Sequence, residues 1–279
     1  MSNIQFQVGK ANISGWSEVE LNSEQLDAPQ CYQDLNFSTT SEIQEYIDGL
    51  GNGTLKTETV QIEGLNIYRE QFSPAENTER KYIRLRLENR NNKTICIERI
   101  SPIKIEPDGL TLGNAEPGDW VMLRQSRFKN ALPTSCVLGS SDPAARDATK
   151  GVPETGGLPL SEPGNEGGAV YVSSECLLLS GDAENILFGF VPTDRQFSNF
   201  TIELTDDQRR LKCLASDLLA DGRELQPAEI YTGQWLILQT GVSPNKMLSE
   251  YATLLETYMD TSLHPQKSTP TVWLSWYYY

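Results

Sequence analysis

The chain is 279 residues long and carries 23 Lys and Arg against 38 Asp and Glu, so its formal net charge is −15. This length suffices for one large all-β domain or two ordinary domains with a sizeable core. The acidic balance disfavours partners with negatively charged surfaces, which excludes nucleic acids and anionic membranes as expected ligands.

The first residues, MSNIQFQVGK, contain neither a basic leader nor an apolar core. No uncharged apolar run approaches the roughly 18 residues that a membrane span requires. We therefore expect a soluble, cytoplasmic protein. Its five cysteines are widely separated and form no C-x-x-C pair, so the sequence predicts neither a disulfide framework nor a zinc site.

The only histidine is His264, which precedes Pro265 in a polar stretch. A Ser-His-Asp or Cys-His site needs a positioned imidazole, and no G-x-S-x-G elbow supplies a nucleophile. Metal sites built on histidine are excluded for the same reason. We expect no metal ion and no cofactor.

In chain order, the first clear pattern is GLGNGTLKTETVQIEG, residues 49–64. It predicts a turn at Asn52-Gly53 followed by a strand. The next is KYIRLRLENRNNKTICIERISPIKIE, residues 81–106, which alternates with period two and predicts a hairpin that turns at NRNN. Its first strand places Tyr82, Arg84, Arg86 and Glu88 on one face and Ile83, Leu85 and Leu87 on the other.

Residues 139–168 are rich in Gly, Pro, Ser and acids and have no periodicity. Such a segment is typical of a disordered loop, with a functional lid as the alternative. Strand patterns resume after it and continue to residue 242 with short polar connections. We expect residues 1–242 to form one large antiparallel β-sandwich.

The pattern then changes to SPNKMLSEYATLLETYMDTSL, which predicts an amphipathic helix with Ser243 as its N-cap and Pro244 at the first helical position. Its apolar face is predicted to hold Leu248, Tyr251, Leu255, Tyr258 and Met259. This helix and a short linker occupy residues 243–268. Residues 269–279, TPTVWLSWYYY, are uncharged and rich in aromatic and β-branched types, which predicts a buried strand.

This ending resembles glycoside hydrolase family thirty-six, which contains melibiase-type α-galactosidases and raffinose synthases. In that family the corresponding segment typically has the sequence Pro-x-Gly-Trp-Cys-Ser-Trp-Tyr. The matching residues are Pro270, Trp273, Ser275, Trp276 and Tyr277. Val272 replaces the glycine and Leu274 replaces the cysteine. The order of elements fits nearly the whole chain, whereas motif similarity is confined to about the last forty residues.

The resemblance implies a mainly β fold, a supersandwich-like domain followed by a linker helix and the first strand of an absent (β/α)₈ barrel. The chain would be the amino-terminal, non-catalytic part of a retaining α-galactosidase, whose partner is an α-galactoside. The family's two catalytic aspartates lie on later barrel strands, so we expect no catalytic residue here. Lys104-Ile105-Glu106 only mimics the family's Lys-x-Asp motif.

The resemblance places Trp276 and Tyr277 near the substrate pocket, as the substrate-binding residues of this chain. An indole face stacks on the C–H face of a sugar, and a phenol hydrogen-bonds to a hydroxyl. Strand alternation directs these two side chains to opposite sides, so simple packing remains the alternative for each. Without its neighbouring strands, this segment would fold back or associate into a homo-oligomer.

Two other interpretations stay open. A free-standing lectin-like sandwich would use Trp16, Trp120 or Trp235 as sugar platforms, although isolated tryptophans in β proteins are more often core residues. A complete β-sandwich enzyme would use carboxylates such as Asp182, Asp206 or Asp207, although the Asp206-Asp207 pair is typical of a solvated turn.

Overall fold

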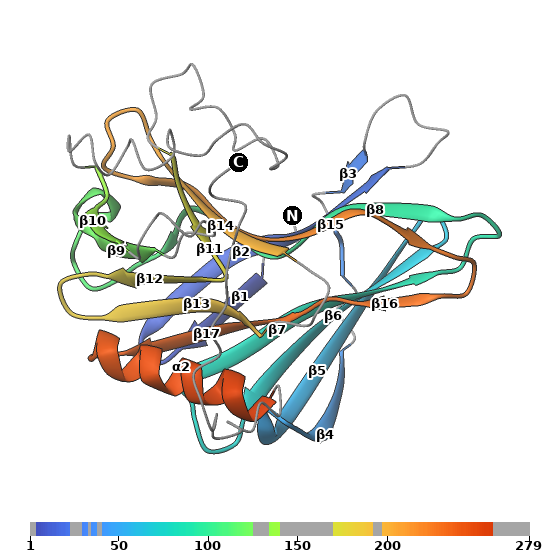
Figure 1. The fold of residues 1–279 in the computed structure, drawn as a ribbon, viewed down its shortest axis with the longest axis horizontal. Coiled ribbons are helices and arrows are strands. Elements are labelled where there is room, and N and C mark those ends of the chain that lie inside the picture. The colour runs from blue at the N-terminus through green and yellow to red at the C-terminus, as the bar shows by residue number, and fades with distance from the viewer. Residues whose placement is uncertain are drawn as a thin grey trace, which may run out of the picture.

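A computed structural model describes residues 4–22, 30–32, 35–37, 41–124, 134–139, 170–191 and 197–258. Two antiparallel sheets face each other, and one helix covers part of the second sheet (Figure 1). The predicted fold class, a β-sandwich followed by one helix, is therefore confirmed. The expected barrel strand at 269–279 lies outside the described residues, as does the predicted loop at 139–168 apart from its first residue.

Sheet A runs in the order β1-β2-β8-β15-β14-β11, with β3 paired to β2. Its strands are β1 (Ile4–Val8), β2 (Ala11–Asn22), β3 (Gln30–Tyr32), β8 (Ile95–Leu110), β11 (Val170–Ser174), β14 (Phe197–Leu204) and β15 (Leu211–Leu225). The long central strands β2, β8 and β15 contain register shifts, which bend the sheet.

Sheet B runs in the order β10-β9-β12-β13-β17-β7-β6-β5-β4, with β16 paired to β7. Its strands are β4 (Glu42–Asp48), β5 (Gly51–Ile62), β6 (Leu65–Pro74), β7 (Arg80–Asn89), β9 (Val121–Arg124), β10 (Thr134–Val137), β12 (Cys176–Ser180), β13 (Asn185–Val191), β16 (Ile230–Thr232) and β17 (Trp235–Gly241). A 3₁₀ turn, Pro117–Asp119, precedes β9, and helix α2 (Pro244–Tyr258) follows β17.

The alternation predicted for β7 is confirmed. Ile83, Leu85 and Leu87 are buried in the main core between the two sheets. Tyr82 belongs instead to a second apolar cluster on the outer face of sheet B. At one end β7 is apolar on both faces, whereas the rest of its outer face is charged. The outer face of sheet B is therefore covered along only part of its length.

The predicted hairpin between β7 and β8 is wrong. β7 pairs with β6, β16 and β17 in sheet B, whereas β8 pairs with β2 and β15 in sheet A, so the chain crosses from one sheet to the other at residues 90–94. Asn89 fixes this crossing. Its side-chain Nδ2 donates to the carbonyls of Lys93 at 2.7 Å and Leu225 at 2.8 Å, and its Oδ1 accepts from the Asn91 N–H at 2.9 Å.

Replacing Asn89 by Ala is expected to lower the free energy of unfolding by roughly 1–3 kcal/mol, because the buried Leu225 carbonyl loses its donor. Urea denaturation measures this change. The matched control is Asn92→Ala in the same crossing, where the side chain is exposed and the expected change is within about 0.5 kcal/mol. Equal stability of the two variants would contradict the role given to Asn89.

The predicted turn at Asn52-Gly53 is also displaced. The turn between β4 and β5 lies at Gly49-Leu50, and Gly53 sits inside β5, opposite Pro74. A Cβ atom on Gly53 would lie 2.2 Å from the Ser73 carbonyl oxygen. This glycine is therefore required by a close strand contact and not by a turn.

Candidate functional site

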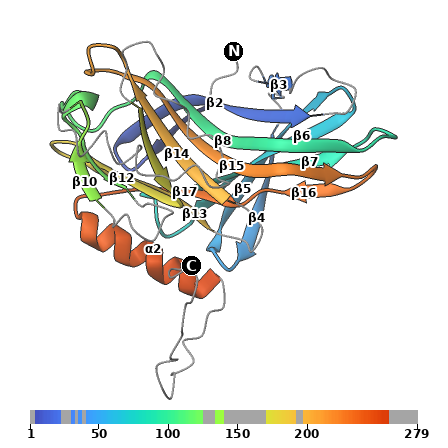
Figure 2. The same cartoon turned by 45° about the horizontal axis from the view of Figure 1, so that its top comes forward.

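Helix α2 is held against the outer face of sheet B, over β13 and β17 (Figure 2). The Ser243 hydroxyl lies 3.4 Å from the Lys246 N–H at the start of the helix, in agreement with the predicted N-cap. The buried face consists of Met247, Tyr251 and Leu254. Leu248, Leu255 and Tyr258, which were predicted on the apolar face, are partly buried. Met259 lies outside the described residues.

Tyr251 is the anchor of this helix. Its ring lies over Gly189 of β13, where a Cβ atom would meet the ring at 2.6 Å. Its hydroxyl donates to the Phe190 carbonyl at 2.5 Å. Burial raises the pKa of Tyr251, so the phenol stays protonated. A ring in a glycine hollow with a directed hydrogen bond fixes both the depth and the rotation of the helix.

Beside the end of α2 lies an aromatic cluster formed by Tyr46, Phe72, Tyr82 and Trp235, with ring centroids 5.4–6.4 Å apart. The Arg84 guanidinium stands 4.0 Å from the centroid of Trp235. Tyr258, the last residue of α2, contacts Gly49 in the turn between β4 and β5. The end of α2 is therefore packed against the turn between β4 and β5.

A second cluster, formed by charged residues, lies on the outer face of sheet A and joins β2, β8 and β15. Lys104 Nζ donates to Glu18 Oε1 at 2.6 Å, and Arg99 Nη2 lies 3.2 Å from the same oxygen. Arg99 also pairs with Glu20 at 2.7 Å and lies 3.8 Å from Asp217 Oδ2. The remaining Asp217 oxygen accepts a short hydrogen bond from Ser101.

The two buried carboxylates of this cluster have opposite pKa shifts. For Glu18, burial disfavours the charged form, but Lys104 and Arg99 outweigh it and lower the pKa below 4.5. For Asp217, burial dominates over Ser101 and Arg99 and raises the pKa above 3.8. Such a pair can serve as an acid and a base. Here, however, Lys104 and Arg99 hold Glu18 Oε1 and Ser101 holds Asp217 Oδ1, so the cluster links three strands.

The predicted substrate-binding residues, Trp276 and Tyr277, lie outside the described residues, as does His264. The lectin-like interpretation fails at two of its three platforms, because Trp120 and Trp235 are 0% and 1% exposed. The Trp120 indole N–H donates to the Ala115 carbonyl at 3.1 Å. Trp16 is half-buried on the outer face of sheet A.

The carboxylates proposed for a complete sandwich enzyme support turns. Asp207 Oδ1 accepts from the Thr205 hydroxyl at 2.5 Å and from the Arg209 N–H at 3.1 Å, in the exposed turn between β14 and β15. Asp182 accepts from the Asn114 N–H at 2.9 Å. Lys104, the first residue of the apparent Lys-x-Asp motif, is bound to Glu18 as expected for a structural strand residue.

Membrane-spanning helices and clusters of metal ligands are both absent from the described residues. No helix in that part of the chain has the length and apolar character needed to cross a bilayer. Within the same residues, no three His, Cys, Asp or Glu side chains gather in an arrangement suited to a metal ion.

The sequence matches no protein-family model, and no curated protein is detectably similar to it. The fold, however, is similar to that of solved α-galactosidases. The α-galactosidase from Lactobacillus brevis gives a TM-score of 0.51 at 10% identity, over 86% of this chain and 31% of that chain. The GH36 α-galactosidase AgaA from Geobacillus stearothermophilus, solved with stachyose, gives 0.50 at 13% identity, over 85% and 32%.

The galactosidase domain of the α-galactosidase–sucrose kinase AgaSK also gives a TM-score of 0.50 at 13% identity, over 80% of this chain and 29% of that chain. The match falls on the amino-terminal β-sandwich region of these proteins. This chain therefore spans about a third of their length. At this identity the likeness shows the fold, and it confirms the resemblance to the sandwich region of that family.

Proposed function

We propose that this chain is the amino-terminal, non-catalytic part of an α-galactosidase-like glycoside hydrolase. Residues 1–242 form its sandwich, residues 243–268 its linker, and residues 269–279 the first strand of a catalytic (β/α)₈ barrel. The observation that supports this best is the anchoring of α2 by Tyr251. A helix fixed in depth and rotation can hold a following domain in one position relative to the sandwich.

The proposed parent enzyme cleaves terminal α-galactosides by a retaining mechanism with two carboxyl groups roughly 5 Å apart. Trp276 and Tyr277 would contact its sugar. Support for the inactivity of the chain alone comes from its buried carboxylates, since Glu18 and Asp217 are engaged by Lys104, Arg99 and Ser101. A cytoplasmic location and assembly into a homo-oligomer belong to the same proposal; cell fractionation and light scattering test them.

The 279-residue chain is expected to release no galactose from raffinose or from an aryl α-galactoside above the rate of a buffer blank. A longer chain that continues through the downstream reading frame should hydrolyse both, with an acceleration of at least about 10⁶-fold over the uncatalysed reaction. A coupled galactose assay measures both rates. Turnover by the 279-residue chain, or a stop codon directly after Tyr279, would refute the proposal.

A further inference from the structure

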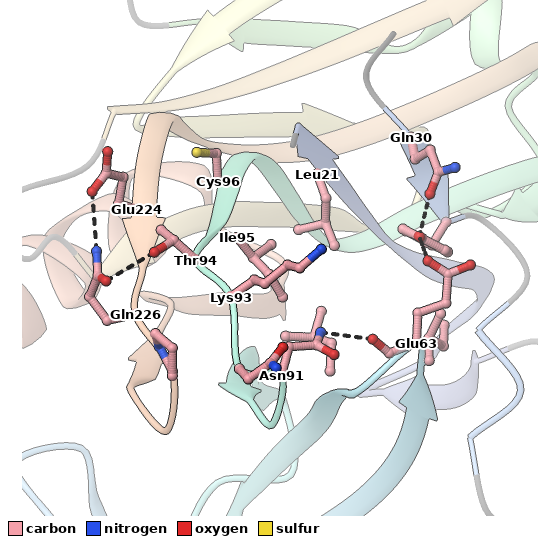
Figure 3. A pocket seen from close by; sticks show the side chains of 15 residues that line it. Leu21, Gln30, Glu63, Asn91, Lys93, Thr94, Ile95, Cys96, Glu224 and Gln226 are labelled. Atoms are coloured by element: carbon pink, nitrogen blue, oxygen red, sulfur yellow. Dashed lines mark hydrogen bonds between the residues drawn. The ribbon is translucent and has the colours of Figure 1, made fainter. Parts of the chain in front are cut away.

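A cavity of about 940 Å³ lies at the end of the sandwich where the chain crosses from β7 to β8, and residues of both sheets line it. Figure 3 shows that its walls come from segments far apart in the sequence: the end of β2, β3, the turn between β5 and β6, the crossing at residues 91–94, and residues 224–227. Figures 1 and 2 both place this end of the molecule, marked by β3 and β16, away from helix α2. Its volume lies within the roughly 300–1,000 Å³ typical of small-molecule sites.

The lining has two parts. An apolar floor is formed by Leu21, Ile62, Leu65 and Ile95. The polar rim carries four carboxamides, two carboxylates, two hydroxyls and one ammonium group, from Gln30, Asn91, Asn92, Gln226, Glu63, Glu224, Tyr32, Thr94 and Lys93. Carboxamides and hydroxyls both donate and accept hydrogen bonds, which is the requirement for binding vicinal sugar hydroxyls above an apolar C–H face.

Hydrogen bonds already hold part of this rim in place. The Asn91 side chain donates to the Glu63 carbonyl at 2.8 Å. Its Oδ1 lies over Gly64, where a Cβ atom would approach it to 2.2 Å. Glu63 and Gly64 both have positive φ angles, 47° and 78°, as a two-residue type I′ hairpin turn requires. The Tyr32 hydroxyl stands 2.8 Å from Glu63 Oε2.

The opposite wall is ordered in the same way. The Thr94 hydroxyl donates to Gln226 Oε1 at 3.0 Å, and Gln226 Nε2 donates to Glu224 Oε2 at 3.2 Å. Each carboxamide keeps further donor or acceptor capacity, because one amide group supports up to four hydrogen bonds. A rim whose rotamers are set before binding loses less entropy when a ligand arrives.

The charges of the rim select among ligand classes. Glu63 and Glu224 outnumber Lys93, and the whole chain is acidic, so anions such as phosphate are disfavoured. Figure 3 shows the two carboxylates on opposite sides of the cavity, an arrangement that does not chelate one cation. A neutral, polyhydroxylated ligand satisfies the lining best.

We propose that this cavity is a non-catalytic binding site for a short neutral oligosaccharide. It begins at Leu65, the first residue of β6, whereas α2 ends near Gly49, beside the far end of the same ten-residue strand. The cavity and the end of α2 are therefore separated by about the length of β6, roughly 30 Å at the usual rise per residue. The site is independent of the proposed barrel and can be tested on the 279-residue chain.

The test is a titration of the ¹⁵N-labelled chain with raffinose, maltotriose and cellotriose, followed by amide chemical shifts and by calorimetry. At least one trisaccharide should bind with a dissociation constant on the order of 1 mM or tighter. The shifts should concentrate at residues 62–65, 91–96 and 224–227. The double variant Asn92→Ala/Gln226→Ala should weaken this binding by about tenfold or more, since two bonding amides are lost.

The matched control is Asn12→Ala/Gln44→Ala, which removes two exposed amides from β2 and β4 outside the cavity lining and should leave the affinity unchanged. Both double variants should show the wild-type unfolding transition. Failure of all three sugars to bind, preferential binding of inorganic phosphate, or equal weakening by the two double variants would each overturn the proposal. None of these outcomes bears on whether a catalytic barrel follows.

Discussion

Replacing Tyr251 by Ala should release helix α2 from the sandwich. The phenol ring is 6% exposed, it fills the hollow above Gly189, and its hydroxyl bonds to the Phe190 carbonyl. Truncating such a side chain removes both its burial and its hydrogen bond, at a cost of about 3–5 kcal/mol. If the docking of α2 is worth less than this, the helix detaches while the sandwich stays folded. Hydrogen exchange at residues 244–258 and urea denaturation together distinguish detachment from global destabilisation.

Two further variants distinguish the contribution of the Tyr251 ring from that of its hydroxyl and from the general effect of a substitution in α2. Tyr251→Phe keeps the ring but leaves the Phe190 carbonyl without this donor, so we expect a loss of about 1 kcal/mol. Ser249→Ala changes an exposed position on the same helix and should alter stability by less than about 0.5 kcal/mol. Unchanged exchange rates in Tyr251→Ala would show that other contacts, such as those of Met247 and Leu254, hold the helix.

Helix α2 also shows which structural features a sequence pattern can predict and which it cannot. Its existence, its cap at Ser243 and the burial of Tyr251 were all predictable, because capping chemistry and helical periodicity are local. Which residues form the centre of the buried face could not be predicted from the sequence. Met247 and Leu254 share a stripe with Tyr251 as well as Leu248 and Leu255 do. The hollow over Gly189, on a strand 62 residues before Tyr251, decides between the two stripes.

The same limit explains the errors in sheet topology. The alternation of β7 predicts which side chains face the core, but it carries no information on the sheet that the next strand will join. Asn89 stabilises the crossing into sheet A through a hydrogen bond to the Leu225 carbonyl, 136 residues further along the chain. Asn52-Gly53 is a typical turn signal, yet the contact of Gly53 with Ser73 places it inside a strand.

The candidate sites follow this pattern too. The cluster around Glu18, Arg99 and Asp217 joins three strands that are distant in the sequence, and the oligosaccharide cavity is assembled from still more segments. The local signal for the cluster was the alternation of SEVELN, which places Glu18 and Glu20 on one face. Trp276 and Tyr277 remain predictions from the family resemblance.

The charged cluster on sheet A predicts opposite consequences for its two buried carboxylates. Glu18→Gln leaves Lys104 without the carboxylate that it contacts at 2.6 Å, and both side chains are largely buried. Breaking a buried ion pair typically costs about 3–5 kcal/mol. We expect a loss near the lower end, because Arg99 keeps its contact with Glu20. Asp217→Asn retains a partner for Ser101 and removes a buried charge, so this variant should be at least as stable as the wild type at neutral pH.

The pH dependence should distinguish these two effects. Glu18 has a lowered pKa in the folded protein, so its stabilising contribution is present above its unfolded pKa of 4.5 and is lost as the pH falls through the lowered value. The disadvantage of Glu18→Gln should therefore be largest at neutral pH and shrink in acid. Asp217 has a raised pKa, so its contribution is fully present below 3.8 and is lost as the pH rises through the raised value. The advantage of Asp217→Asn should therefore grow with pH.

Urea denaturation of the wild type and both variants from about pH 3 to about pH 8 measures these trends as differences in the free energy of unfolding. The groups that face the carboxylates, namely Glu20, Arg99 and Lys104, are common to all three proteins, so the differences report the substituted carboxylate together with its coupling to these groups. If Glu18→Gln were as stable as Asp217→Asn at neutral pH, Lys104 would have to find another partner or reach water. The cluster would then contribute little to holding β2, β8 and β15 together, and the bent centre of sheet A would depend on its apolar inner face alone.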